Sequence, residues 1–154
     1  MAAEARISSL LGVEATLSQG MPVLQLPREQ ILAAARALRD EHGYDMLLDV
    51  TAVDWLGQPG PRFEVVWHFY SSRDCTRVRL KTRVDEADPT VDSRVPLYGS
   101  ARFMERECHE MYGIRFRGND DLRPILLYEG FVGHPLRKDY DMRHEQPLVK
   151  YRDS

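Results

Sequence analysis

Two alternating runs decide the fold of this chain: Phe63-Glu64-Val65-Val66-Trp67-His68-Phe69-Tyr70 and Thr76-Arg77-Val78-Arg79-Leu80-Lys81-Thr82-Arg83-Val84. In both runs apolar side chains recur at almost every second position, which places them on one face of a strand. A short polar loop (71–75) connects the runs, and short connections favour antiparallel neighbours. We therefore expect two paired strands that bury a single apolar face.

The residues before these strands add a helix and further strands. Between Pro27 and Gly43 the apolar residues recur at i, i+3, i+4 and i+7, which predicts an amphipathic helix over 28–42. Residues 13–26 alternate around a turn and predict a hairpin, and residues 46–54 predict a half-apolar strand. The sum is an α+β domain, a mostly antiparallel sheet with helices covering one face.

The pattern changes after a second helix. Apolar residues share one helical face within 100–112, where Ser100 suits the N-cap and Gly113 suits the stop. Residues 114–154 show no sustained period and contain repeated Gly and Pro, yet they carry apolar side chains that need burial. We therefore expect a core domain over 1–113 and an extended C-terminal arm over 114–154 that packs on a partner.

Composition excludes several classes of protein. The 154 residues fit one domain, and no apolar run is long enough to span a membrane or insert directly. The first residues resemble neither a signal peptide nor a transit peptide, which favours a cytosolic start. A net charge of −3 argues against a general nucleic-acid binder. Only Cys75 and Cys108 are present, so the chain cannot alone supply four thiolates to an iron–sulfur cluster.

A charged cluster on the second helix could suggest a metal or catalytic site, but its spacing does not fit one. A metal site with two His residues one helical turn apart would need a His at position 113, which is Gly113. The Glu-x-x-His motif of di-iron sites would need a Glu at position 106, which is Arg106. The i, i+4 neighbours Glu105 and His109, and likewise Arg106 and Glu110, favour pairing on an exposed face or an interface role. The alternative from another class is a free-standing small α+β enzyme that uses Glu105, Glu107 and His109.

A second group of charges lies on the strand over 76–84. Arg77, Arg79, Lys81 and Arg83 alternate with its apolar residues and form a cationic stripe. A solvated sheet face that discourages aggregation is the favoured interpretation, and an acidic patch on a partner is the alternative. No G-x-S-x-G motif and no glycine-rich phosphate-binding turn is present in the sequence.

The run His134-Pro135-Leu136-Arg137-Lys138-Asp139-Tyr140 is suited to protein recognition. Proline fixes the backbone, the basic side chains supply donors, and the acid and the ring add an acceptor and an amphipathic surface. Because no nucleophile or cofactor motif accompanies this run, an interface is favoured over a catalytic role.

The succession from 105 to 140 resembles the signature of the 30 kDa subunit family of respiratory complex I, the type C polypeptide of the bacterial enzyme. A weaker match covers 49–55, and the departures are Phe103 for Trp, Asn119 for His and Gly130-Phe131 for Asp-Trp. The signature positions, which we expect to form the partner interface, are Glu105, Arg106, Glu107, Glu110, Tyr112, Gly113, Ile114, Asp121, Leu122, Arg123, Ile125, Leu126, Gly133, His134, Pro135, Leu136, Arg137, Lys138, Asp139 and Tyr140.

The resemblance implies a non-catalytic scaffold subunit in the hydrophilic arm of proton-translocating NADH:quinone oxidoreductase. Its C-terminal arm would embrace the quinone-site subunit (the type D polypeptide), and other hydrophilic-arm subunits would also be partners. NADH, FMN, iron–sulfur clusters and quinone would belong to other subunits, so this chain would be part of an enzyme only within the complex. It would lie peripherally on the cytoplasmic face of the bacterial inner membrane. The equivalent subunit of a membrane-bound hydrogenase or another complex I-like dehydrogenase is the alternative.

Overall fold

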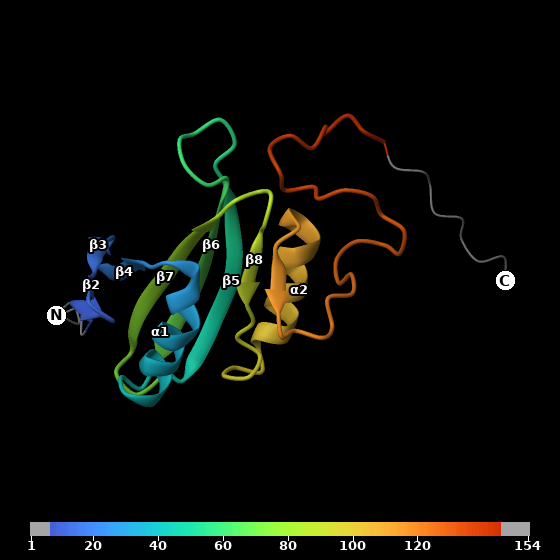
Figure 1. Cartoon of the computed structure of the whole chain (residues 1–154). Coiled ribbons are helices and arrows are strands. Elements are labelled where there is room, and N and C mark those ends of the chain that lie inside the picture. The colour runs from blue at the N-terminus through green and yellow to red at the C-terminus, as the bar shows by residue number, and fades with distance from the viewer. Residues whose placement is uncertain (1–6, 146–154) are drawn as a thin grey trace, which may run out of the picture.

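A five-stranded sheet forms the centre of the computed structural model, which describes residues 7–145 (Figure 1). Its strand order is β3-β4-β7-β6-β5. The bounds of these strands are β3 Thr16–Ser18, β4 Met21–Gln25, β5 Met46–Asp54, β6 Phe63–Ser71 and β7 Thr76–Val84. The helices are α1 (Arg28–Asp40) and α2 (Ala101–Tyr112). Two small sheets pair β1 (Ser9–Leu10) with β2 (Val13–Glu14), and β8 (Thr90–Asp92) with β9 (Arg115–Arg117).

Most of the central sheet is antiparallel, as the sequence predicts. Strands β5, β6 and β7 form a meander in which Trp67 lies opposite Val50 on one side and Leu80 on the other. The hairpin expected over 13–26 is also present as β3 and β4. The parallel pairing of β4 with β7 was not predicted. It arises because α1 carries the chain from β4 to the far edge of the sheet, and the meander then returns beside β4.

One hydrophobic core lies between the sheet and both helices. The expected faces of β6 and β7 are buried, and Trp67, Phe69 and Leu80 have no exposed surface. Ile31 and Leu38 of α1 are equally buried, and α2 contributes Ala101 and Cys108 to the same cluster. Each fully buried large apolar side chain stabilises the fold by roughly 1.5–3 kcal/mol. The α+β architecture with helices on one face is therefore confirmed.

Helix α2 ends as expected but begins differently. Gly113 has φ 79°, and its N–H bonds to the carbonyl oxygen of His109 at 2.7 Å. Ser100 occupies the N-cap position, but its backbone is already helical and its hydroxyl donates to the carbonyl of Leu47 at 3.2 Å. Ser100 therefore ties the start of α2 to β5 instead of capping the helix.

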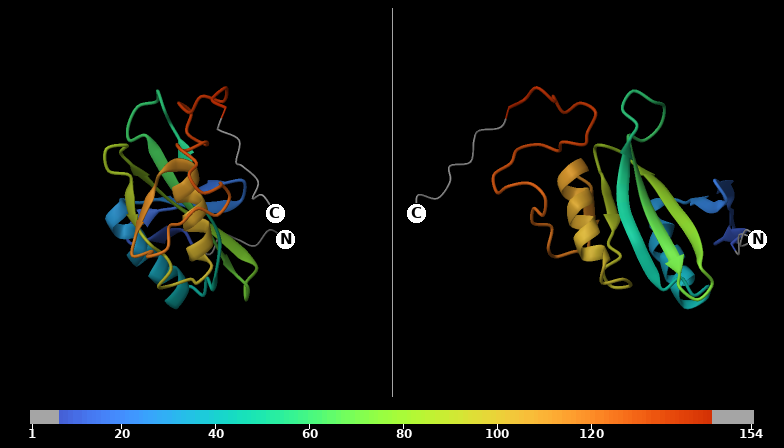
Figure 2. Two further views of the ribbon diagram at one scale, coloured as in Figure 1. Left: turned by 90° about the vertical axis from the view of Figure 1, so that its right-hand side faces the viewer. Right: turned by 180° about the vertical axis from the view of Figure 1, so that it is seen from behind.

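The chain returns to the core once more before it becomes irregular. Ile114 and Phe116 are buried, on either side of the first residue of β9. Residues 118–145 contain no helix or strand and pass along the side of α2 that faces away from the sheet (Figures 1 and 2). The division into a core and an arm at residue 113 stays a prediction. Residues 146–154 of the expected arm lie outside the described residues. Neither helix within residues 7–145 has the length and apolar composition needed to cross a bilayer.

Candidate functional site

The signature after residue 130 caps the C-terminal end of α2. The last carbonyls of a helix have no partner within it and must be satisfied from outside. His134 Nδ1 donates a hydrogen bond to the carbonyl oxygen of Glu110 at 2.9 Å. The N–H of Leu136 donates to the carbonyl oxygen of Met111 at 3.2 Å. Arg137 Nε donates to the carbonyl oxygen of Tyr112 at 2.7 Å. Because the guanidinium is cationic, it also complements the negative end of the helix dipole. Segment 134–137 therefore serves as the cap of α2.

Gly113 makes this cap sterically allowed. Its left-handed backbone conformation disfavours a side chain. A Cβ atom at this position would also collide with the guanidinium of Arg137 and the imidazole of His134. Glycine is thus required both to end the helix and to admit the residues that cap it.

The polar side of α2 organises segment 123–127. The Glu110 carboxylate accepts the N–H groups of Ile125, Leu126 and Leu127 at 3.2, 2.9 and 2.9 Å. Arg106 donates to the two carbonyls that precede them, those of Arg123 and Pro124, at 2.9 and 2.8 Å. These backbone groups have no strand partner, so two charged side chains satisfy them.

The expected pairing of Arg106 with Glu110 on an exposed face is therefore wrong. Glu110 is only 8% exposed, and both side chains bind the backbone of the arm. The same correction applies to Glu105 and His109. Glu105 is fully buried, and His109 Nδ1 bonds to the carbonyl of Ile114 at 2.7 Å. The charges on this helix satisfy backbone groups packed against it, which a helical-wheel pattern does not reveal.

Glu105 anchors α2 to the loop that precedes it. Its carboxylate accepts the Arg94 N–H at 2.6 Å, the Ser93 hydroxyl at 2.7 Å and the Asn119 amide at 3.0 Å. Burial raises the pKa of Glu105, and these three hydrogen bonds oppose the rise. Asn119, one of the departures from the family pattern, thus donates to a signature residue. Glu107 is exposed, so Glu105, Glu107 and His109 do not converge on one point.

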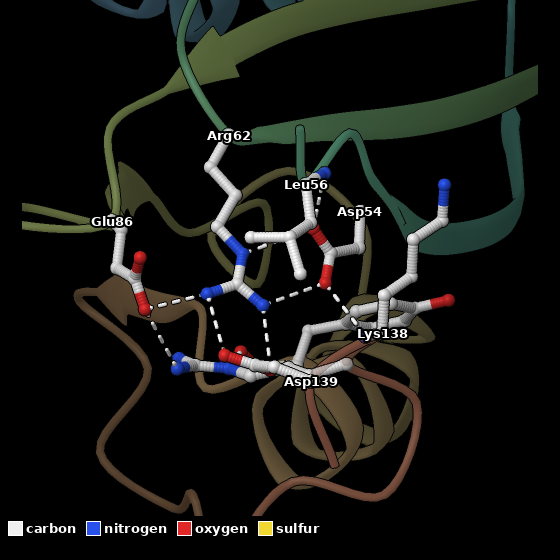
Figure 3. A network of polar contacts seen from close by, with 8 residues as sticks. Asp54, Leu56, Arg62, Glu86, Lys138 and Asp139 are labelled. Carbon is white, nitrogen blue, oxygen red and sulfur yellow. Dashed lines mark hydrogen bonds and ion pairs between the residues drawn. The ribbon is translucent and has the colours of Figure 1, made fainter. Parts of the chain in front are cut away.

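Arg62 binds the last part of the signature to the sheet (Figure 3). Its guanidinium makes paired hydrogen bonds to Asp54, at 3.0 and 2.8 Å, and to Asp139, at 3.0 and 2.7 Å. Glu86 is a third acidic partner at 2.7 Å. The Lys138 N–H donates to Asp54 at 2.8 Å. This cluster, which we call the Arg62 network, joins the ends of β5 and β7 to the arm.

The Arg62 network holds its acids in the charged form. The guanidinium lowers the pKa of Asp54 to about 2 and also lowers the pKa of Asp139, while these acids raise the pKa of Arg62. Sequence reasoning missed Asp54, Arg62 and Glu86 as site residues. No periodic signal marks them, because Arg62 precedes its strand and its partner Asp139 is 77 positions away.

Two further signature residues pack the arm against itself. The Tyr140 ring stacks on Phe131 with centroids 6.2 Å apart, and Phe131 meets Tyr128 edge-on at 5.5 Å. Gly133 has φ 103°, and a Cβ atom there would lie 2.8 Å from the Tyr140 ring. Gly133 and Tyr140 therefore shape the arm.

The remaining signature residues lie near the surface. Asp121 pairs with Arg123 at 2.7 Å, which lowers the pKa of Asp121 to about 2, and lies 3.9 Å from Arg106. Leu122 packs partly against the core, Pro135 is half-buried, and Lys138 is exposed. Within residues 7–145 no group of three or more His, Cys, Asp or Glu side chains could hold a metal ion.

Several large apolar side chains of α2 and the arm are exposed to solvent. The exposed large apolar residues here are Phe103 (57%), Ile125 (39%), Leu126 (62%), Val132 (73%), Leu136 (52%) and Met142 (96%). A pocket of about 210 Å³ opens between α2 and the arm, with His109, Leu122, Leu127, Phe131 and His134 among its lining residues. Polar contacts thus hold the inner side of the arm, while the outer side offers apolar side chains to solvent.

Comparisons with known proteins identify the family to which this chain is similar. The family model described as respiratory-chain NADH dehydrogenase, 30 Kd subunit, matches residues 24–146. The type C polypeptide of NADH-quinone oxidoreductase from Citrifermentans bemidjiense is 43% identical over 131 residues, which cover 85% of this chain and 81% of the relative. The C/D polypeptide of NADH-quinone oxidoreductase from Bdellovibrio bacteriovorus is 39% identical over 85% of this chain and 23% of its own length. The solved trypsin-resistant fragment of Nqo5 superposes with a TM-score of 0.63 at 32% identity, covering 72% of this chain and 90% of the fragment.

Proposed function

This chain belongs to the respiratory-chain NADH dehydrogenase 30 Kd subunit family, and from that premise we propose that it is a non-catalytic scaffold subunit of a proton-translocating NADH:quinone oxidoreductase. In this proposal its arm and α2 bind the quinone-site subunit, the type D polypeptide. The redox cofactors belong to other subunits, and the chain lies peripherally on the cytoplasmic face of the bacterial inner membrane through its partners.

The exposure of large apolar side chains on α2 and the arm supports the proposal. Leu126 is 62% exposed although its N–H is bound by Glu110 of α2, and Val132 is 73% exposed. Grouped exposed apolar residues mark interaction surfaces, and a surface that is already ordered loses little entropy on binding. The pocket between α2 and the arm suits one apolar side chain of the partner.

The quinone-site subunit is the partner that the relatives favour. The Bdellovibrio bacteriovorus relative carries the names of the C and D polypeptides in one chain, of which the region similar to this protein is 23%. Fusion of two proteins places them in one assembly at equal copy number. We extend that pairing to this chain.

The chemistry of the signature supports a scaffold role. Glu105, Glu110 and Arg62 are engaged with groups of their own chain, which leaves them no free position at a substrate. Burial raises the pKa of the Cys108 thiol well above its usual value, so it is not a nucleophilic thiolate. The free-standing enzyme is disfavoured because its three candidate residues do not converge. The equivalent subunit of a hydrogenase or another complex I-like dehydrogenase is the alternative, and it would differ in the subunits with which it assembles.

A double substitution on the outer side tests the proposal. Leu126→Asp with Val132→Asp should leave the free energy of unfolding within about 0.5 kcal/mol per site, because both side chains are exposed. The amount of the chain that co-purifies with the quinone-site subunit should fall at least about tenfold, because burying an unpaired charge at the interface weakens binding. Leu17→Asp is the control, because Leu17 is 67% exposed on β3.

Activity measured on the same preparations decides between scaffold and catalyst. NADH:quinone reductase activity should follow the amount of assembled complex in every variant. Normal assembly combined with lost turnover would contradict the scaffold role, and normal recovery with the quinone-site subunit would contradict the proposed interface.

A further inference from the structure

The face of the central sheet turned away from the helices carries a row of cations. Arg77, Arg79, Lys81 and Arg83 point to this face because they alternate with the buried residues of β7. Seen from behind, the strands stand in front of α1, and the arm lies beyond α2 (Figure 2). This group of cations contrasts with the net charge of the whole chain, which is −3.

Two of the four cations are engaged within the chain. Lys81 Nζ lies 3.0 Å from the Glu64 carboxylate on β6. Arg83 donates to the carbonyl of Pro59 at 3.0 Å, and its guanidinium lies 4.9 Å from the centre of the Trp55 ring. This end of the row is therefore a satisfied part of the fold.

The other two cations have no acidic partner within residues 7–145. Arg77 and Arg79 form no ion pair there, and Arg79 Nε is buried without a hydrogen-bond acceptor. The pairing register places His68 between Arg79 and Asp49, the nearest acid in this row.

The neighbours of these arginines do not neutralise them. His68 is half-buried, and burial together with the charge of Arg79 lowers its pKa, so it stays uncharged at neutral pH. Tyr70 lies opposite Arg77, and Val23 of β4 lies opposite Arg79. The surface therefore combines the guanidinium groups of Arg77 and Arg79 with the His68 imidazole and the Tyr70 ring, and Asp49 lies beyond His68.

We propose that this surface, formed by Arg77, Arg79, His68 and Tyr70, binds an acidic segment of another polypeptide. Guanidinium groups bind carboxylates through paired hydrogen bonds, and Arg with Tyr is typical of protein interfaces. A duplex nucleic acid typically engages about 6–10 cations, and an anionic membrane about 4–8. Two arginines without an acidic partner in the described part of the chain fall short of both. The surface lies on the opposite face from α2 and the arm, so it stands independently of binding to the quinone-site subunit.

A defined acidic probe tests the surface on the full chain. An octaglutamate peptide should bind, and Arg77→Gln with Arg79→Gln should weaken its binding about tenfold, as loss of charge-assisted contacts does. Arg36→Gln with Arg115→Gln is the matched control, because it removes the same charge from exposed positions outside the surface. The control should bind like the unmodified chain. All variants should keep the same thermal midpoint.

A crosslinking experiment in the assembled complex then tests whether an acidic segment contacts the proposed surface. A photo-crosslinking phenylalanine analogue in place of Tyr70 should link to a segment rich in Asp and Glu, and Arg77→Gln with Arg79→Gln should remove that link. Equal weakening of peptide binding by the control pair would overturn the proposal. Tighter binding to phosphatidylglycerol vesicles or to duplex DNA than to the peptide would also overturn it, as would a crosslink to a segment without acids.

Discussion

The central sheet with α1 and the arm over residues 118–145 satisfy their backbone groups in different ways. In the sheet, strands pair with one another and Trp67, Leu80 and Ile31 fill the space beneath them. In the arm, backbone groups bind side chains and helix ends of α2, while Leu126 and other apolar residues face outward. The first region is stabilised by its interior, and the second by the element that it wraps.

A segment without periodicity can therefore be held in place by specific polar contacts. The arm supplies caps to α2, and α2 supplies carboxylate and guanidinium partners to the arm. Neither can satisfy its polar groups alone. Three substitutions and one change of pH test these two modes of stabilisation.

The largest effect should come from the interior of the sheet. Trp67→Ala should lower the free energy of unfolding by about 3–5 kcal/mol, because it empties a fully buried position. Urea unfolding followed by far-ultraviolet circular dichroism measures this loss. Phe103→Ala, at a 57% exposed position, should change it by less than about 0.5 kcal/mol. Arm amides that stay protected from exchange after the sheet has unfolded would show that the arm is independent.

The junction between the two regions should come next. Arg62→Met leaves the buried Asp54 carboxylate without its cation, which should cost about 3 kcal/mol. Amide exchange should rise most at Lys138, whose N–H binds Asp54. Arg28→Met, which removes an exposed pair with Asp88, is the control and should cost less than about 1 kcal/mol. Unchanged exchange at Lys138 would mean that the Arg62 network does not hold the arm.

The cap of α2 should contribute a smaller amount. Gly113→Ala should cost roughly 1–3 kcal/mol through its positive φ, and somewhat more because the new methyl group displaces Arg137 and His134. Gly130→Ala is the matched control, since its φ is 91° and nothing lies within 4 Å of the added Cβ. Equal losses in the two variants would show that backbone strain alone, and not the cap, explains the effect.

Acid should produce the smallest change, confined to the arm. The pKa of Asp54 is about 2 in the folded chain and that of Asp139 is lowered, both below the unfolded value of about 3.9. Their contribution is therefore complete above about pH 4 and lost as the pH falls through the folded pKa values. Amide exchange at Lys138, corrected for intrinsic rates, should rise between about pH 4 and 2. Arg62→Met should remove this dependence, and a rise in that variant of the same size would assign it to other acids.

The sequence predicted the regular elements because their burial is periodic. The faces of β6 and β7, the helix α1 and the stop at Gly113 follow from spacing alone, and the structure has them. The parallel contact of β4 with β7 did not follow, because it depends on where α1 delivers the chain. Local patterns carry no information on such a crossover.

The contacts of the signature residues did not follow from the sequence. The signature named Glu110, Arg137 and Asp139, which the structure brings to α2 and to the Arg62 network. These residues make contacts within the chain, and their expected role in a partner interface stays a prediction. Arg62 carried no signal, because its contacts join segments far apart in sequence and involve no repeated spacing.

The cap of α2 has a consequence for biosynthesis. Residues 134–137 cap a helix that precedes them in the sequence. A nascent chain on the ribosome therefore exposes the unbonded carbonyls of α2 until residues 134–137 have been translated. The Asp54 carboxylate likewise lacks its hydrogen bond from the N–H of Lys138 until that residue, 84 positions later, has been translated. Contacts of such long sequence separation form late in folding. We expect a product terminated before residue 134 to keep a frayed end of α2 and an Asp54 carboxylate that lacks one of its hydrogen-bond donors.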